Sequence, residues 1–192
     1  MRIAIEGIDG AGKDTQTALL LDFFKQKGID VQVVKVPDPN RPVGKIIHQF
    51  LEREIDLSPM VQFLLFTADH RHGLDQVQGE GTVIFNRYVT STLAYQGSQG
   101  AVSVEKGKQI VEACGFPALD IIFYLAISPD TSVQRKREQK AHPDRFESDR
   151  AFQEQLLGSY QQLIDQQVLG KWISIDGEQS PEQVHQAIIA HL

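Results

Sequence analysis

The stretch GIDGAGKDT, residues 7–15, decides the fold of this chain. Gly7, Gly12 and Lys13 have the spacing of a Walker A phosphate-binding loop, and the stretch lies between an apolar segment and a helical pattern, where such a loop belongs. Glycines let backbone N–H groups curl around phosphate oxygens, and the N-terminus of the following helix adds partial positive charge. Lys13 is expected to bridge the β- and γ-phosphates of a nucleoside triphosphate. The alternative is a tight turn with a surface lysine. The predicted nucleotide-binding residues are Gly7, Asp9, Gly10, Ala11, Gly12, Lys13, Asp14 and Thr15.

Asp14 departs from the loop pattern. The position after the lysine is normally Ser or Thr, whose neutral hydroxyl binds Mg²⁺, and here the hydroxyl comes one residue later at Thr15. A carboxylate can bind Mg²⁺, but it also repels a triphosphate unless the metal screens the charges. Asp14 is therefore a candidate metal ligand. The alternative is a helix-start carboxylate that the helix dipole favours.

Apolar strand-like and helix-like segments alternate along the chain. The expected strands cover residues 2–6, 30–36, 82–86, 120–127 and 172–176. The expected helices cover residues 15–27, 43–53, 58–74, 104–114, 129–140, 149–167 and 181–192. This order predicts one α/β domain over residues 1–192, with a parallel sheet of about five strands covered by helices on both faces. Ligands bind such sheets beyond the carboxyl ends of the strands, so segments 37–42 and 86–87 should meet the glycine loop there.

Composition narrows the function classes. The net charge of −6 over 192 residues argues against a protein that coats nucleic acid, because such a protein needs broad cationic surface. No apolar run approaches the roughly 20 residues that cross a membrane, and we expect no membrane association. The single cysteine, Cys114, cannot form an intrachain disulfide, and the N-terminus has no signal-peptide pattern. We therefore expect a cytoplasmic protein.

Four segments together resemble the thymidylate kinase family. They are EGIDGAGKDTQ (6–16), FLLFTADHR (63–71), NRYVTSTLAYQG (86–97) and DRFE (144–147). The likeness covers roughly residues 1–176, and the combination is far more specific than the loop alone. It implies a three-layer P-loop fold and the reaction of ATP with dTMP to give ADP and dTDP, with Mg²⁺ as cofactor. The resemblance also implies a homodimer.

The resemblance assigns residues to the sugar and phosphate of the substrate. Asp9 is expected to contact the sugar 3′-hydroxyl, and Arg87 is expected to bind phosphate between donor and acceptor. Tyr95 is expected to pack under the sugar and exclude a 2′-hydroxyl, and Gln96 to complete that wall. Packing in the core is the alternative for Tyr95, and a solvated surface position is the alternative for Arg87.

The resemblance also implies a base site. Phe66 is expected to stack on the pyrimidine, while Ser91 and Thr92 face it; a plain core position is the alternative for Phe66. His70 stands where the family usually has an arginine that reads a base carbonyl, and Arg71 follows one place later. One residue along a helix is 100° of rotation, so Arg71 can replace that arginine only if the helix shifts.

A basic segment over residues 135–147 resembles the family's mobile lid. Arginines that close over the transferring phosphoryl group lower the barrier by stabilising its charge. In the family the extra arginine comes either from the glycine loop or from the lid, and Gly10 and Ala11 carry no charge, so the resemblance implies that the lid supplies it. The alternative is a solvated basic helix face. The candidates are Arg135, Arg137 and Arg145.

Two further departures concern charge at the phosphate site. Asn86 stands where the family has an aspartate, and Asp14 carries a carboxylate where the family has none. Both positions should flank the metal, so we interpret the two changes as one compensating exchange; a degraded site is the alternative.

Another departure concerns the substrate phosphate. Pro39 stands near the position where the family has an arginine that binds this phosphate, with Arg41 close by. These departures leave two rival functions open: a P-loop kinase for another nucleotide or nucleoside, and a nucleotide-binding protein without catalysis.

Overall fold

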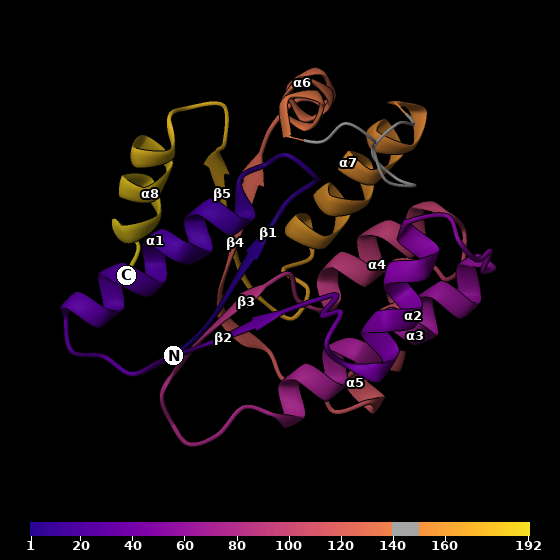
Figure 1. The fold of residues 1–192 in the computed structure, drawn as a ribbon, viewed down its shortest axis with the longest axis horizontal. Coiled ribbons are helices and arrows are strands. Elements are labelled where there is room, and N and C mark those ends of the chain that lie inside the picture. Colours follow the sequence, from indigo (N-terminus) through magenta and orange to yellow (C-terminus); the bar gives the residue numbers. More distant parts are fainter. Residues whose placement is uncertain (140–149) are drawn as a thin grey trace.

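A five-stranded, wholly parallel sheet forms the centre of the computed structural model, which describes residues 1–139 and 150–192 (Figure 1). The spatial order of its strands is β2-β3-β1-β4-β5. The strands are β1 (Arg2–Glu6), β2 (Val31–Lys35), β3 (Thr82–Asn86), β4 (Leu119–Ala126) and β5 (Gly170–Asp176). The predicted α/β architecture and its five parallel strands are confirmed.

Helices cover both faces of the sheet and form the two outer layers. Helices α1 and α8 pack together on one face, while α3, α4, α5 and α7 form a layer on the other (Figure 1). The helices are α1 (Lys13–Gln26), α2 (Pro42–Leu51), α3 (Pro59–Asp75), α4 (Val89–Ser98), α5 (Val104–Ala113), α6 (Pro129–Gln139), α7 (Arg150–Asp165) and α8 (Pro181–Ile189).

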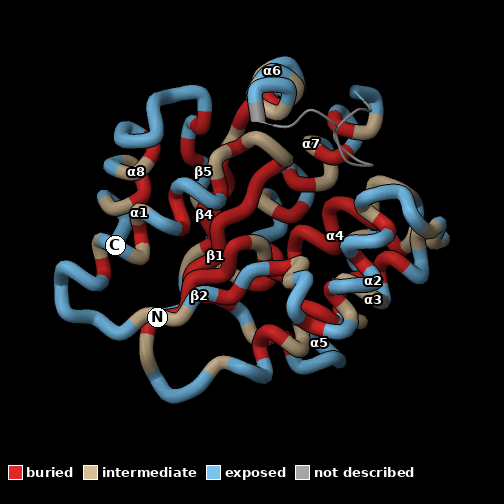
Figure 2. The backbone as a smooth tube through the Cα atoms, in the orientation of Figure 1, coloured by how far each residue is buried: buried red, intermediate tan, exposed pale blue. Residues whose placement is uncertain are grey.

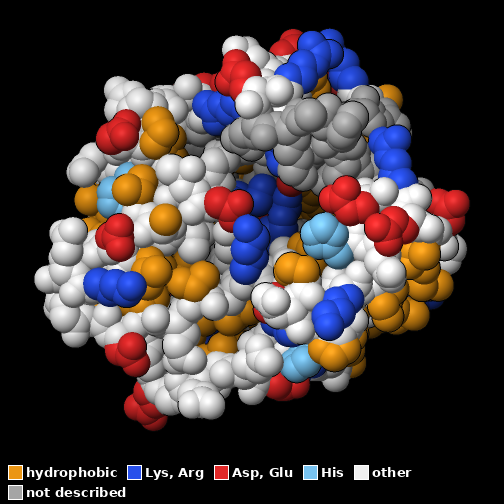
Figure 3. Space-filling view, viewed as in Figure 1, with side chains coloured by type: hydrophobic (Ala, Val, Ile, Leu, Met, Phe, Trp, Pro, Cys, Tyr) orange, Lys and Arg blue, Asp and Glu red, His pale blue; other side chains and the backbone are white. Residues whose placement is uncertain are grey.

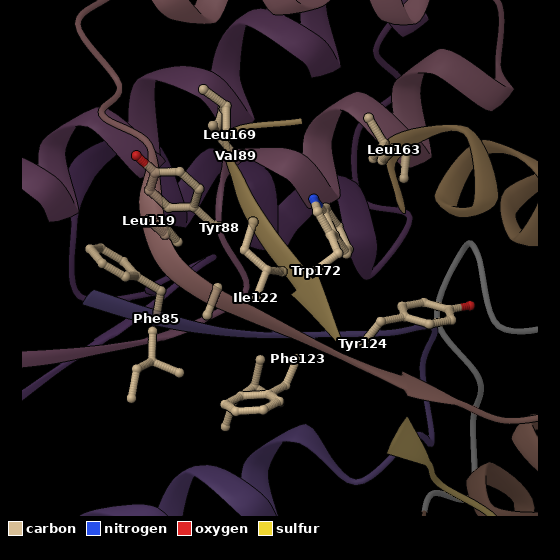
Figure 4. Packing of buried hydrophobic residues seen from close by; sticks show 14 of the residues in the cluster. Phe85, Tyr88, Val89, Leu119, Ile122, Phe123, Tyr124, Leu163, Leu169 and Trp172 are labelled. Carbon is tan, nitrogen blue, oxygen red and sulfur yellow. The ribbon is translucent and has the colours of Figure 1, made fainter. Parts of the chain in front are cut away.

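The central strands form because their sequences are apolar on both faces. Ile3, Ala4 and Ile5 of β1 are completely buried, and all five residues of β3 are buried (Figure 2). A parallel strand with helices on both sides requires this pattern. Aromatic rings belong to this core, and the ring centres of Phe85 and Tyr88 lie 5.0 Å apart (Figure 4).

Helix α4 was not expected from the sequence. Each residue from 89 to 96 is buried, so the segment lacks the alternating apolar and polar faces that reveal a surface helix. Tyr88, the residue before the helix, also offers no side-chain cap. The helices that were expected are present, with small shifts at their ends. Ser180 begins α8 with a full capping box.

No helix within residues 1–139 and 150–192 is long and apolar enough to cross a membrane.

The loops after β1, β2 and β3 meet at one edge of the sheet, as the alternation of elements predicted. Lysine and arginine side chains gather there in a hollow of the surface (Figure 3). Part of the predicted lid, including Arg145 and the motif at 144–147, lies outside the described residues.

Candidate active site

The glycine loop between β1 and α1 has the backbone that its sequence predicts. Gly7 has a φ of 144°, and a Cβ added there would lie 2.8 Å from the carbonyl oxygen of Leu125. Gly12 begins α1 with a left-handed φ of 95°, which a residue with a Cβ adopts only with strain. Within this loop the Lys13 ammonium donates hydrogen bonds to the carbonyl oxygens of Gly7 at 3.0 Å and Ile8 at 2.8 Å. The lysine is therefore already folded over the loop.

Charges around Lys13 shift its proton equilibrium. Burial of the ammonium, followed by repulsion from Arg87, lowers the pKa of Lys13 to about 7, although the Asp9 carboxylate 3.8 Å away opposes the shift. Burial also raises the pKa of Asp9, but Arg87 and Lys13 outweigh it and hold that pKa well below its usual range. A polyanion bound here would favour the charged lysine.

Asp9, Arg87 and Tyr95 form one hydrogen-bonded cluster. The Arg87 guanidinium donates to Asp9 Oδ1, and the Tyr95 hydroxyl donates to Asp9 Oδ2 at 3.0 Å. Arg87 also donates to the carbonyl oxygen of Gly7 at 3.2 Å, which ties the end of β3 to the glycine loop. Its backbone φ of 70° lies in the left-handed region, a conformation that costs a non-glycine residue of order 1–3 kcal/mol and recurs at functional sites.

Two cavities meet at this cluster. The first has a volume of about 130 Å³ and the second of about 570 Å³; Asp9 and Arg87 line both. The first also contains Phe66, His70, Ser91, Thr92, Tyr95 and Gln96, every one of them a predicted base- or sugar-site residue. The second contains the loop residues Gly10, Gly12, Lys13, Asp14 and Thr15, together with Lys35, His48, Glu52, Asn86 and Lys136.

His70, not Arg71, faces the first cavity. Burial, followed by repulsion from Arg41 and Arg87, lowers the pKa of His70 to about 3, so its ring is neutral at physiological pH. Arg71 turns outward, where it pairs with Asp75 and donates to the carbonyl oxygen of Gly115 at 2.8 Å. The 100° of rotation between neighbouring helical residues separates the two side chains.

Arg41 also lies outside both cavities. Its guanidinium is buried behind β2, where its Nε lies 2.9 Å from Asp69 Oδ1 and its Nη2 donates to the carbonyl oxygen of Lys35 at 2.6 Å. Burial raises the pKa of Asp69, although a backbone hydrogen bond from Asp38 and the Arg41 charge oppose it. Arg41 therefore holds the loop after β2 against α3, and the structure does not bring it to the predicted phosphate position.

Asp14 and Asn86 are in contact although 72 residues separate them. The Asn86 amide donates to Asp14 Oδ1 at 2.6 Å, and the Lys35 ammonium donates to the same oxygen at 2.8 Å. Burial raises the pKa of Asp14, but the hydrogen bond and charge of Lys35 outweigh it and lower the pKa. Lys35 was not among the predicted site residues; the signal in the sequence was its place at the end of a strand.

Glu6 is a second residue that the sequence analysis missed. Its carboxylate is completely buried and accepts hydrogen bonds from the backbone N–H of Tyr88 at 2.9 Å, Thr90 Oγ1 at 2.6 Å, Ser91 Oγ, and the Tyr160 hydroxyl at 3.1 Å. These bonds fix the start of α4 directly after Arg87. The feature of the sequence that could have indicated Glu6 is an acidic residue at the end of an otherwise apolar strand.

The described lid residues take different positions. Arg135 donates to the carbonyl oxygen of Gly10 at 3.3 Å and to that of Gly177 at 2.9 Å, so it fastens α6 to the glycine loop. Lys136 lines the larger cavity, while Arg137 is exposed. The catalytic roles expected for Arg135, Arg137 and Arg145 stay predictions.

A glycine loop between a strand and a helix, with cationic side chains beside it at the edge of a parallel sheet, is typical of P-loop nucleotide-binding proteins. Comparison with known proteins narrows the class. The family model described as thymidylate kinase matches residues 5–188, and the chain belongs to that family.

Similar relatives span the whole chain. A thymidylate kinase of Chlorobium chlorochromatii is 32% identical over all of this chain and 94% of its own length. A thymidylate kinase of Chlorobium luteolum is 31% identical over all of this chain and 96% of its own length. One from Caldanaerobacter subterraneus subsp. tengcongensis is 31% identical over 97% of this chain and 92% of its own length.

Proposed function

We propose that this protein transfers the γ-phosphoryl group of ATP to dTMP and so forms ADP and dTDP. One observation carries the proposal: the cavity lined by the expected base-site residues shares Asp9 and Arg87 with the phosphate cavity beside it. A monophosphate in the first cavity would therefore present its phosphate to the γ-phosphate held at Lys13. The match to thymidylate kinases favours this function over the two rivals, a kinase for another nucleotide and a non-catalytic binder.

The proposed catalysis is positional and electrostatic. A phosphate oxygen of dTMP attacks the γ-phosphorus in line as the bond to the β–γ bridging oxygen breaks. A phosphate monoester is already nucleophilic, so the step requires no strong general base. Lys13 and Arg87 stabilise the charge on the transferring oxygens, and the lid arginines close over it. Asp9 orients Arg87 through their ion pair and can accept a hydrogen bond from the sugar 3′-hydroxyl.

The residues at the start of α1 fit a magnesium ion. Asp14 Oδ1 is occupied by Lys35 and Asn86, whereas Oδ2 has no hydrogen-bond partner among the described residues. One carboxylate oxygen with nearby hydroxyl and amide oxygens suits Mg²⁺, which is typically bound by one or two carboxylates plus substrate phosphates. Asp14, Thr15 and Asn86 would hold the ion, which would neutralise part of the phosphate charge.

The sugar-binding part of the proposal rests on Tyr95. Its ring lies in the first cavity, and its hydroxyl is held by Asp9 and Arg87. A ring fixed in this way leaves little space for a ribose 2′-hydroxyl, so deoxyribonucleotides should be preferred over ribonucleotides as substrates. Gln96 continues the same wall one residue later.

A coupled ADP-release assay with ATP and Mg²⁺ tests the proposed function. We expect turnover with dTMP and none above background with AMP, GMP or UMP. Lys13→Ala should abolish turnover and leave the fold intact. Lys25→Ala, which removes an exposed lysine from the last turn of the same helix, is the matched control and should keep the wild-type rate. An enzyme that gives no ADP with dTMP, or a Lys13→Ala variant with the wild-type rate, would overturn the proposal.

The proposed assembly is a homodimer in the cytoplasm. Met60, Val61 and Leu64 of α3 expose 42%, 40% and 55% of their surfaces, which makes an apolar face for a second copy of the chain. Light scattering should give twice the mass of one chain, and the Leu64→Glu variant should give the mass of a single chain.

Cys114 is the only cysteine in the sequence, and it is unpaired, as a reducing compartment permits.

A further inference from the structure

The base end of the first cavity contains polar groups without partners. The Thr92 hydroxyl and both polar atoms of the Gln96 amide are buried, and none has a hydrogen-bond partner among the described residues. The buried His70 ring lies edge-on to Tyr88, and within the same part of the chain no hydrogen bond reaches its nitrogens. Buried polar groups are normally paired, so these three side chains hold unused hydrogen-bonding capacity in the wall of the cavity.

Each of these groups can act both as a donor and as an acceptor. A neutral imidazole has one N–H and one lone pair, an amide has an NH₂ group and a carbonyl oxygen, and a hydroxyl rotates to suit its partner. Burial keeps the His70 ring in the neutral form, because its pKa is lowered to about 3. His70, Thr92 and Gln96 thus impose no fixed hydrogen-bond polarity on a base.

The nearby cations, which could only donate, are held elsewhere. Arg41 is paired with the buried Asp69, and Arg71 turns outward to Asp75. Arg87 is held at the phosphate end of the cavity by Asp9. The apolar lining, formed by residues such as Val36 and Phe66, offers area but no polarity.

Thymine and uracil differ from cytosine chiefly in polarity. Thymine presents a carbonyl oxygen at C4 and an N–H at position 3, whereas cytosine presents an amino group and a bare nitrogen at the same places. We propose that His70, Thr92 and Gln96 accommodate either pattern, so that the protein phosphorylates dCMP as well as dTMP.

This inference rests on the proposed function and widens its substrate class to pyrimidine deoxynucleoside monophosphates. In the added reaction a phosphate oxygen of dCMP bonds to the γ-phosphorus of ATP. The bond from that phosphorus to the β–γ bridging oxygen breaks, and the products are dCDP and ADP. The same Lys13 and Arg87 act on the phosphates, since the base lies at the far end of the cavity.

Two matched substrate pairs test the inference: dUMP against dCMP, and dTMP against 5-methyl-dCMP. The members of each pair differ only at positions 3 and 4 of the base. We expect kcat/KM to differ by less than about tenfold within each pair, because a group that can reverse its polarity leaves nothing unpaired. A loss on the order of 10²-fold or more for both cytosine nucleotides would overturn the inference, since a site of fixed polarity rejects the wrong pattern by at least that factor.

Direct binding separates this inference from the proposed function. Calorimetric titration of the wild-type protein with the four nucleotides gives their affinities without turnover. Absence of turnover with dTMP would sink the proposed function alone, while similar affinities within each pair would still support the inference. Rejection of both cytosine nucleotides in binding, beside normal turnover of dTMP, would sink the inference alone.

Substitutions at His70 test its part in the effect. His70→Arg fixes a donor at this position, so discrimination against dCMP relative to dUMP should rise to the order of 10²-fold. His70→Gln keeps both polarities, is the matched control, and should keep the wild-type ratio. If His70→Arg does not fold, Gln96→Glu, which fixes an acceptor above the carboxyl pKa, should shift the ratio toward dCMP instead. An unchanged ratio in the folded variant would overturn the role of that residue.

Discussion

The contact between Asp14 and Asn86 permits a quantitative test of the hypothesis that the carboxylate at position 14 compensates for the one missing at position 86. Asn86→Asp places a second carboxylate beside Asp14, where the amide now donates at 2.6 Å. Two like charges about 4 Å apart repel by about 1 kcal/mol in water and about 4 kcal/mol at an effective dielectric of 20. Asp14 is largely exposed and Lys35 lies 2.8 Å from it, so we expect a cost near the lower value.

Asp14→Ser damages the site in a different way. It removes the acceptor of the buried Asn86 amide and of Lys35, and an unpaired buried donor costs about 1–3 kcal/mol. It also removes a carboxylate from the proposed metal site. The double variant Asp14→Ser/Asn86→Asp restores one carboxylate and a hydroxyl that can donate to it. It should recover activity that each single variant loses.

The assay is a double-mutant cycle on kcat/KM for ATP, measured over a range of Mg²⁺ concentrations. We expect a coupling of about 0.5–3 kcal/mol, as for residues in direct contact. Asp22→Ser combined with Asn86→Asp is the control, because Asp22 is exposed on the same helix about 12 Å farther along. Asp14 and Asn86 effects that add within about 0.5 kcal/mol would refute the compensation and favour the degraded-site interpretation.

Three further outcomes follow from the site. At pH 8, ADP binding should take up nearly one proton, because Lys13 with a pKa of about 7 is mostly neutral before a polyanion binds; at pH 6 the uptake should vanish, and calorimetry in two buffers measures both. Tyr95→Phe should keep the preference for dUMP over UMP, whereas Tyr95→Ala should narrow it; equal kcat/KM for the two nucleotides in the wild type would refute the steric role. Alanine at Arg135, Arg137 or Arg145 should lower kcat on the order of 10²-fold for at least one of the three, and full kcat in every single variant would place the role elsewhere.

The sheet could be predicted because its strands are short apolar runs bounded by turn residues. The glycine loop could be predicted because its spacing and its position between strand and helix agree. Helix α4 could not, since a helix buried all round has no periodic pattern. The contact of Asp14 with Asn86 agrees with the prediction that both residues lie at one edge of the parallel sheet; whether they exchanged a carboxylate stays a hypothesis.

Side-chain direction was the part of the site that the sequence could not supply. Arg41 lies close in sequence to the position where a phosphate-binding arginine was expected. Its ion pair with Asp69 nevertheless holds its guanidinium behind β2, away from both cavities. Glu6 contacts Tyr160 across 154 positions, a distance at which no local pattern carries information. The contact of Lys35 with Asp14 depends on how the end of β2 lies in space relative to α1, and no pattern in the sequence contains that position.

Lys35 also changes the meaning of the carboxylate exchange. An unpaired carboxylate at position 14 would repel a triphosphate, which is the physical basis of the degraded-site interpretation. With the Lys35 ammonium 2.8 Å away, Asp14 is half of a neutral pair and adds no net negative charge to the cavity. The compensation hypothesis therefore has to include three residues, Asp14, Lys35 and Asn86, because the lysine and the amide both donate to the carboxylate and neither adds a second negative charge. A chain with a net charge of −6 can in this way keep a locally cationic phosphate site.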